Sequence, residues 1–415
     1  MSASLRALVA AVSRRGDAPP AFVLGTGCNG ISFLKSLGRR GIPVAAIDSW
    51  MQAGMYSRYC VPIVAPDPIE QEEELLDRIM EIGGELPRRG VLLTTTDASA
   101  LLVSKHRGRL SEHFDFTVSD HETIRRLTSK RAQIELAREM GVPTPISLFP
   151  DKEGVEAVAR EIPYPCIIKP SNSHLWSLFL RDHGRPGWGK LREARSPSEL
   201  VSVYNEMRES GLEFVVQEKI GGGDDQLYGL LTYLDRSSTP LGVFTKRKIR
   251  QYPRGYGNGS LQVGIWDPDV ADLGLRLLRE LDYQGIAGVE FKRDPADGRL
   301  KLIEINPRSI SQTYHAVVSG VDIPYIAYRD AMGADVRKAL SFREGIIWVS
   351  LERDLKAFLE YHRNGDLELG EWLRSWRGER CYAYFSMDDP LPACAALWQF
   401  LRAEIRSWRS RQPSS

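Results

Sequence analysis

The stretch "GVEFKRDPADGRLKLIEINPR", residues 288–308, carries the strongest structural signal in this chain. Two apolar segments flank a polar turn that is rich in Asp and contains Gly, a pattern that predicts a β-hairpin. Folding the hairpin about the centre of that turn places Glu290 opposite Glu304 and Gly288 opposite Asn306. Because side chains alternate between the two faces of a strand, both carboxylates and the amide share one face.

Two carboxylates that face each other repel, and they destabilise a sheet unless a cation lies between them. Mg²⁺ prefers oxygen ligands and is usually held by one or two carboxylates together with substrate phosphates. Glu290, Glu304 and Asn306 are therefore predicted metal ligands, and Arg308 on the same face is suited to a phosphate or a developing negative charge. The alternative is an exposed hairpin with solvated carboxylates, but the apolar residues around both glutamates favour a strand within a sheet.

Three segments earlier in the chain carry residue types that suit a bound nucleotide. Lys169 ends the apolar segment "CIIK", where a lysine is either a snorkelling strand end or a phosphate ligand. Lys130 begins a helical segment, where a cation opposes the helix dipole unless an anion binds nearby. In "QEKIGGGDDQLYG", residues 217–229, the end of a strand can present backbone groups to an adenine, and an acid can hold ribose hydroxyls.

These segments follow one another in a fixed order. A lysine precedes a helix that ends in "GVPTP", and then come "IIKP", "QEKI" with "GGGDD", and "GVEF" with "LIEINPR". Together they resemble the ATP-grasp superfamily, and in particular its predicted ATP-dependent carboxylate–amine ligases. The resemblance covers about residues 21–335. Each motif is weakly specific by itself, whereas the ordered set is specific.

The resemblance implies a nucleotide site. Lys130 and Lys169 would contact the phosphates of ATP, with Lys169 also near the adenine. The other implied contacts are Glu218 and Ile220 at the adenine, Lys219 between them, and Asp225, or its neighbour Asp224, at the ribose.

The resemblance also implies the metal and catalytic residues. Glu290, Glu304 and Asn306 would bind Mg²⁺ between the phosphates; two ions are expected, with Mn²⁺ as an alternative ion. Arg308 would stabilise the transferring phosphoryl group or the intermediate.

Two more basic residues belong to the implied catalytic set. Lys248 and Arg250 lie two residues apart on a predicted strand, so they would face the γ-phosphate or a substrate carboxylate together. The segment "PRGYGNGS", residues 253–260, would form a mobile loop over the reacting groups.

One departure from the family pattern lies in residues 171–190. Many relatives carry a glycine-dense phosphate loop soon after the second lysine, whereas the glycines here are late and scattered. His174 and Lys190 are candidate phosphate ligands in this lid, although the favoured interpretation of His174 is a surface loop residue. The glycines are Gly184, Gly187 and Gly189.

The order of apolar and helical segments predicts the domain organisation. Residues 21–125 alternate strands with helices, which indicates a parallel sheet covered by helices on both faces. An α+β pattern follows, with a boundary near 125–145. The fold class is therefore α/β and α+β. The resemblance implies a Rossmann-like pre-ATP-grasp domain, an ATP-grasp fold whose two α+β subdomains clasp ATP, and a C-terminal extension.

The expected ranges are 1–125 for the first domain, 126–335 for the ATP-grasp domain (lid about 145–217, large subdomain about 218–335) and 336–415 for the extension. The strands expected in the first domain are 21–25, 43–48, 90–97 and 114–118.

A glycine-rich loop near the N-terminus suggests a different function. Gly25, Gly27 and Gly30 form G-x-G-x-x-G after an apolar segment, and Asp48 follows the next one, as in a dinucleotide-binding dehydrogenase. Any doubly wound domain can use such glycines for a tight turn. We interpret the loop as at most a substrate-side contact at Gly27, Cys28 and Asn29.

Composition limits the partners and the compartment. The 415 residues contain 55 Lys plus Arg against 54 Asp plus Glu, which gives no case for binding nucleic acid. Five cysteines without a C-x-x-C motif suit a reducing, cytoplasmic environment. No transmembrane segment is expected. The expected partners are small-molecule carboxylate and amine substrates, and a homodimer stays open.

The function implied by the resemblance is an ATP- and Mg²⁺-dependent ligase that joins a carboxylate to an amine. An acyl phosphate would form first, with release of ADP, and the amine would then expel phosphate. The alternatives are an ATP-grasp enzyme that activates bicarbonate, a non-catalytic ATP-binding module and the dehydrogenase. The complete set of metal ligands argues against the non-catalytic module.

Overall fold

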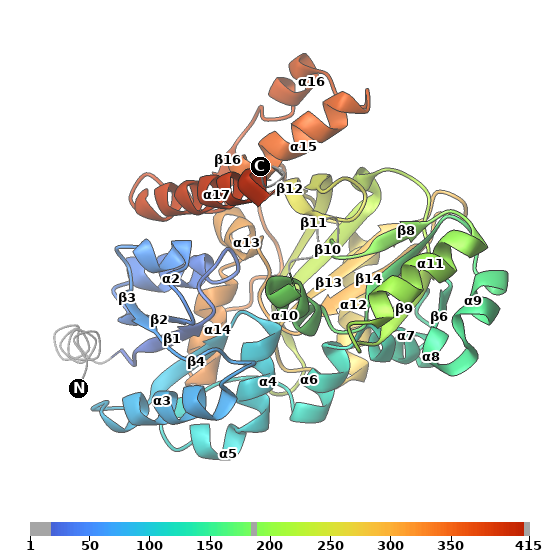
Figure 1. Ribbon diagram of the computed structural model, residues 1–415. Helices are drawn as coiled ribbons and strands as arrows, with labels where there is room; N and C mark the ends of the chain where they lie inside the picture. The colour runs from blue at the N-terminus through green and yellow to red at the C-terminus, as the bar shows by residue number, and fades with distance from the viewer. Residues whose placement is uncertain (1–17, 184–188, 411–415) are drawn as a thin grey trace.

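The computed structural model describes residues 18–183 and 189–410, whose strands form three sheets (Figure 1). The N-terminal sheet is parallel, in the order β3-β2-β1-β4-β5. Its strands are β1 (Ala21–Leu24), β2 (Val44–Asp48), β3 (Val61–Val64), β4 (Gly90–Thr94) and β5 (Phe114–Asp115). Its helices are α2 (Ile31–Arg39), η1 (Ala53–Tyr56), α3 (Glu72–Gly84), α4 (Asp97–Lys105) and α5 (Arg107–Leu110). The predicted parallel sheet is confirmed, although the prediction missed β3 and extended the last strand beyond β5.

Strand alternation explains how this sheet acquires helices on both faces. Phe22 and Leu24 of β1 belong to one hydrophobic core, which also contains residues of α3 and α4. Ala21 and Val23 belong to a second core, together with residues of α2 and of a helix much later in the chain. Each core continues onto the large sheet, so the two sheets are packed against each other through shared apolar side chains.

A small antiparallel sheet has the order β6-β9-β7-β8. Its strands are β6 (Ser147–Leu148), β7 (Cys166–Pro170), β8 (Arg192–Ala194) and β9 (Phe214–Glu218). The helices of this segment are α8 (Pro150–Glu153), α9 (Val155–Glu161), α10 (Ser173–His183) and α11 (Pro197–Arg208). Helix α10 occupies most of residues 171–183, where a lid with few glycines is expected from the sequence. Of the lid glycines, Gly184 and Gly187 lie outside the described residues.

The large sheet is seven-stranded, in the order β14-β13-β10-β11-β12-β15-β16, and is antiparallel except for its last pair. Its strands are β10 (Leu227–Leu234), β11 (Pro240–Tyr252), β12 (Asn258–Gly264), β13 (Gly285–Arg293), β14 (Leu300–Asn306), β15 (Ile347–Val349) and β16 (Arg380–Tyr382). The remaining helices up to residue 331 are α6 (His121–Leu127), α7 (Lys130–Glu139), η2 (Asp224–Gln226), α12 (Pro268–Glu280), α13 (Thr313–Ser319) and α14 (Ile323–Ala331).

The hairpin β13–β14 has the predicted register. Glu290 pairs with Glu304, and Gly288 pairs with Asn306. The register shifts by one residue just after Glu290, where Phe291 pairs with Leu302. A Cβ on Gly288 would lie 2.7 Å from a side-chain carbon of Ile310, so the glycine permits close packing there.

Residues 336–410 pack against the rest of the protein, and two of their strands belong to the large sheet. Strands β15 and β16 complete the large sheet, and α15 (Leu351–Arg363) packs on β11 and β12. Helices α15 and α16 (Leu369–Arg374) project from the top of the molecule in Figure 1, and α17 (Leu391–Ser410) lies over the N-terminal unit. Helix α17 lies on η1 of the N-terminal unit, where Gln399 donates to the carbonyl of Met51 at 2.9 Å. Among the described helices, none is long and apolar enough to span a membrane.

Candidate active site

A cavity of about 1000 Å³ lies where the three sheets meet. Most of the sequence-predicted residues line it, although they come from segments between residues 130 and 308. Those that line the cavity are Lys130, Lys169, Glu218, Lys219, Ile220, Asp225, Lys248, Glu290, Glu304, Asn306 and Arg308.

Two lysines approach each other on one side of this cavity. Lys169 lies one residue before the end of β7 and is buried, and its Nζ donates to Oε1 of Gln217 at 2.9 Å. Burial and the positive charge of Lys130 lower the pKa of Lys169 to about 7. Lys130 is the first residue of α7, and its Nζ donates to the hydroxyl of Ser173. A polyphosphate would relieve the repulsion between the two ammonium groups and restore the charge on Lys169.

The end of β9 supplies the residues predicted to contact the adenine. The carboxylate of Glu218 is held by Lys301 at 2.9 Å, so it serves as a fixed part of the wall. Lys219 pairs with Glu193 on β8 at 2.7 Å, and the carbonyl of Ile220 accepts from Lys292 at 3.0 Å. These contacts hold the strand end in place beside the cavity, and its role in base recognition stays a prediction.

The two neighbouring acids Asp224 and Asp225 have different surroundings. Asp224 accepts from Gln251 at 2.7 Å and from the backbone of Gly255 at 3.1 Å, and the hydroxyl of Tyr361 also donates to it. Asp225 is exposed, and Gln226 donates to it only weakly, at 3.5 Å. Asp225 is therefore the acid that is available for ribose hydroxyls.

We expect Asp225→Ala to raise KM for ATP about 10-fold, because a hydrogen bond to a charged group contributes roughly 1.5–3 kcal/mol. The same substitution should change KM for an ATP analogue that lacks the ribose hydroxyls by less than about 2-fold. Steady-state kinetics with both nucleotides checks this. An equal loss with both nucleotides would remove Asp225 from the ribose site.

The hairpin carboxylates face two lysines of β11. Oε1 of Glu290 lies 3.0 Å from Nζ of Lys248, and Nζ of Lys246 donates to Gln262 at 2.8 Å. Burial raises the pKa of Glu290, but the charges of Lys248 and Lys246 outweigh burial and leave it lowered, so this carboxylate is ionised.

The donor set of the hairpin fits Mg²⁺. The side chains of Glu304 and Asn306 have no hydrogen-bond partner among the described residues, and both line the cavity beside Glu290. Two carboxylates and an amide oxygen on one face are hard oxygen donors. Gln133 of α7 bonds both backbone groups of Ile305, at 2.8 and 2.9 Å, which fixes the helix of Lys130 against the strand of the metal ligands.

Arg308 follows this strand and reaches the N-terminal unit. Its Nε donates to Asp97 at 2.7 Å, and Asp97 is the first residue of α4, at the C-terminal end of the parallel strand β4. Burial raises the pKa of Asp97, but Arg308 outweighs burial and leaves it lowered. The ion pair orients the guanidinium at the cavity wall and joins the parallel sheet to the nucleotide side.

The expectation that Arg250 faces the γ-phosphate with Lys248 is wrong. The register shifts between these two residues, so the bulge reverses the alternation: Lys248, Ile249 and Gln251 line the cavity, whereas Arg250 does not. The Arg250 guanidinium is buried and donates to both oxygens of Asp354, at 3.1 and 2.9 Å. Arg250 is therefore a structural residue in this fold.

The loop after β11 contacts the lid sheet. Lys190 donates to Asn258 at 2.6 Å, and the Tyr256 hydroxyl donates to Glu193. Residues 254–259 line the cavity, and Asn258–Gly264 form β12, so only residues 253–257 are a loop. Movement of this loop over the reacting groups stays a prediction. His174 is not a loop residue: it lies on α10 and lines the cavity.

Sequence reasoning missed the contribution of the C-terminal residues. The end of α15 and the turn after it line the cavity through Glu360, Tyr361, Asn364 and Asp366. Arg254 of the loop pairs with Asp366 at 2.7 Å and donates its backbone N–H to Glu360 at 3.0 Å. No motif marks these residues; their amphipathic helix period was the only available signal.

The N-terminal glycine loop, residues 25–30, forms the tight turn between β1 and α2. Gly25 has φ +93°, and a Cβ on Gly30 would lie 2.1 Å from the carbonyl oxygen of Gly25. Asp48 accepts from the backbone of Thr26 at 2.6 Å and from its hydroxyl at 2.9 Å, so it braces the loop. Of the three residues proposed as substrate-side contacts, Asn29 lines the cavity, whereas Gly27 and Cys28 do not.

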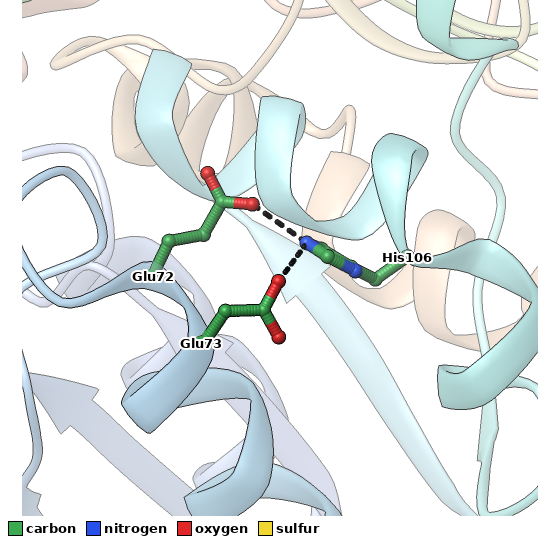
Figure 2. A group of neighbouring side chains, drawn as sticks. All are labelled: Glu72, Glu73 and His106. Atoms are coloured by element: carbon green, nitrogen blue, oxygen red, sulfur yellow. Dashed lines mark hydrogen bonds and ion pairs between the residues drawn. The ribbon is translucent and has the colours of Figure 1, made fainter.

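One further group of possible metal-binding side chains lies outside this cavity, at Glu72, Glu73 and His106 (Figure 2). His106 lies 2.6 Å from Glu72 and 3.9 Å from Glu73. Lys105 also pairs with Glu72 at 2.7 Å, and Arg109 lies 3.5 Å from Glu73. Basic side chains already neutralise these carboxylates, so the group is an ion-pair network that joins α3 to α4.

Comparisons with known proteins agree with this geometry. The family model "Carbamoyl-phosphate synthase L chain, ATP binding domain" matches residues 270–339, which include the carboxylate hairpin and Arg308. The chain is 25% identical to D-aspartate ligase of Enterococcus faecium (strain Aus0004) over 325 residues, which cover 75% of this chain and 76% of that protein. It is also 24% identical over 263 residues to the carbamoyl phosphate synthase large chain of Methanothermobacter thermautotrophicus, of which it covers only 24%.

Solved structures share the fold. The ADP complex of PurK, N5-carboxyaminoimidazole ribonucleotide synthetase, superposes with a TM-score of 0.62 at 13% identity, covering 84% of this chain and 87% of that one. L-amino acid ligase from Bacillus licheniformis superposes with a TM-score of 0.56 at 15% identity, covering 76% and 75%. The chain has the ATP-grasp fold preceded by a doubly wound domain, and the resemblance seen in the sequence is confirmed.

Proposed function

We propose that this protein is an ATP- and Mg²⁺-dependent ligase that joins a carboxylate to an amine and releases ADP and phosphate. The observation that carries the proposal is the convergence of four basic side chains and three oxygen donors on one cavity. The basic residues are Lys130, Lys169, Lys248 and Arg308, and the donors are Glu290, Glu304 and Asn306. This arrangement suits phosphoryl transfer, in which positioning and charge neutralisation supply most of the catalysis.

The chain's residues divide the work between two steps. In the first step, Lys130 and Lys169 hold the phosphates while the substrate carboxylate attacks the γ-phosphorus and ADP leaves. In the second step, Arg308 stabilises the charge that develops at the acyl carbon while the amine attacks and phosphate leaves. Glu290, Glu304 and Asn306 would hold Mg²⁺, which would supply neutralisation of the phosphate charge. Two ions, or Mn²⁺ in their place, are part of the proposal.

The names of the relatives support an amino acid as the carboxylate substrate. D-aspartate ligase and L-amino acid ligase both act on amino acids by name. The alternative function is activation of bicarbonate. It is supported by the structural similarity to a biotin carboxylase domain, with a TM-score of 0.58, and by the sequence similarity to a carbamoyl phosphate synthase large chain, of which this chain covers 24%. The D-aspartate ligase similarity extends over 76% of that protein and favours the amino-acid substrate.

We expect the protein, given MgATP and pools of D- and L-amino acids, to release ADP and phosphate and to form a new amide mass. Phosphate release and mass spectrometry of the products check this. Release of AMP and pyrophosphate would contradict an acyl phosphate mechanism. Phosphate release that depends on bicarbonate, without an amide product, would favour the alternative.

Two finer parts of the proposal concern the protein's setting. All five cysteines are free thiols, which supports a reducing cytoplasm. A homodimer is supported by the exposed Leu351, Leu355 and Leu359 on α15, which a second copy would bury. The mass of the protein in solution tests the dimer.

A further inference from the structure

His174 is a half-buried residue of the cavity wall whose ring nitrogens have no hydrogen-bond partner among the described residues. It is the second residue of α10, and it lines the cavity beside Lys130 and Asp97. Its Nδ1 is buried without a hydrogen-bond partner among the described residues, whereas its Nε2, which also has no partner there, is accessible. One nitrogen of a neutral imidazole is an acceptor, so the free Nε2 can accept a proton from a ligand in the cavity.

The walls around His174 come from the N-terminal unit and from the segment after Arg308. Asp97 accepts from Arg308, and Asn29 accepts from the hydroxyl of Ser311 at 2.9 Å. Both Asn29 and Ser311 line the cavity. This end of the cavity is therefore polar, and it adjoins the guanidinium that faces the reacting carbonyl in the proposed function.

We propose that His174 and Asp97 form the site of the amine substrate and that Nε2 of His174 accepts a proton from that amine. The inference rests on the proposed function and adds the base that the ligase reaction needs. An alkylammonium has a pKa near 10.4, as in lysine, so at neutral pH it must lose a proton before its nitrogen can attack.

In the second step the amine loses two protons, the N–C bond forms and the C–O bond to phosphate breaks. Nε2 of His174 takes one proton from the substrate ammonium, and the freed lone pair forms the N–C bond at the acyl carbon. The C–O bond to phosphate breaks, and the leaving phosphate takes that electron pair and the second nitrogen proton. His174 then returns its proton to solvent.

The charges that face His174 suit this role. Burial lowers the pKa of His174, the negative charge of Asp97 raises it and the positive charge of Lys130 lowers it further, so that the pKa lies below its usual value. The ring is therefore neutral at pH 7 and can accept a proton. Once the ring is protonated, Asp97 stabilises the imidazolium. Lys130 and Arg308 disfavour the ammonium form of a bound amine, which makes its deprotonation easier.

Hydroxylamine separates this role from a structural one, because it is already unprotonated at neutral pH and traps the acyl phosphate without a base. In His174→Gln we expect the rate of amide formation to fall on the order of 100-fold, the usual contribution of a general base. Hydroxamate formation with the same amino acid should change by less than about 3-fold. The probes are the amino acid that supports hydroxamate formation in the unmodified protein and the amine that gives an amide with it.

His183→Gln is the matched control, because His183 is exposed on the same helix and contacts the carbonyl of Phe179. It should leave both rates unchanged. An equal loss of amide and hydroxamate in His174→Gln, or no loss of either, would overturn the inference. Absence of hydroxamate in the unmodified protein with every amino acid would instead contradict the proposed ligase function.

Discussion

Glu304→Gln is expected to lower turnover on the order of 1000-fold while the protein stays folded. Glu304 pairs directly with Glu290 across the hairpin, and its carboxylate forms no hydrogen bond or ion pair with a described residue. An amide of the same shape keeps the strand and its packing but removes one negative charge from the Mg²⁺ site. The measurement is ATP- and amino-acid-dependent phosphate release, with circular dichroism to verify the fold.

Glu280→Gln provides the control for this substitution. Glu280 ends α12 and is exposed, so the same chemical change there should leave turnover unaltered. Turnover within about 3-fold of the unmodified protein in Glu304→Gln would mean that the hairpin is not the metal site.

Asp354→Ala is expected to destabilise the protein by about 3–5 kcal/mol, the usual loss when one partner of a buried ion pair is removed. Asp354 is 0% exposed and accepts from Arg250, Ser260, Trp372 and Trp376 at 2.8–3.1 Å. The substitution leaves the Arg250 guanidinium buried without a counter-charge. It also releases α15 and α16 from strands β11 and β12. Urea denaturation of the full chain measures the loss.

Asp366→Ala is the matched comparison for Asp354→Ala. Asp366 pairs with Arg254, but their side chains are 38% and 46% exposed, so the loss should be about 0–1 kcal/mol. Equal destabilisation by the two substitutions would show that burial of the Arg250 pair does not matter for stability.

The hairpin illustrates how much of the site local sequence can predict. Strand alternation and a polar turn suffice to place Glu290 opposite Glu304, because pairing in a hairpin is fixed by the turn and by a period of two. The ordered motifs likewise predicted the ATP-grasp fold and the residues that meet in the cavity. Local periodicity could not reveal the bulge after Lys248, and for that reason Arg250 was placed on the wrong face.

The C-terminal residues and His174 show what local patterns leave out. Residues 360–366 reach the cavity only because β15 and β16 add to the far edge of the large sheet and carry α15 over it. Neither short strand has a distinctive sequence. Residue type and spacing favour a surface loop for His174, whereas it lies on α10 and lines the cavity.

Local sequence and motif order were enough to predict the doubly wound first domain, the carboxylate hairpin and the class of nucleotide chemistry, because each depends on contacts between residues that are close in the chain or on an ordered set of motifs. Packing between the sheets selects the cations that face the cavity, leaves Asp225 rather than Asp224 available, and brings His174 to the cavity wall. Those outcomes depend on burial and on ion pairs between residues far apart in the chain, such as Arg308 with Asp97 and Arg250 with Asp354. Side-chain pairs of this kind form only after the sheets have packed together.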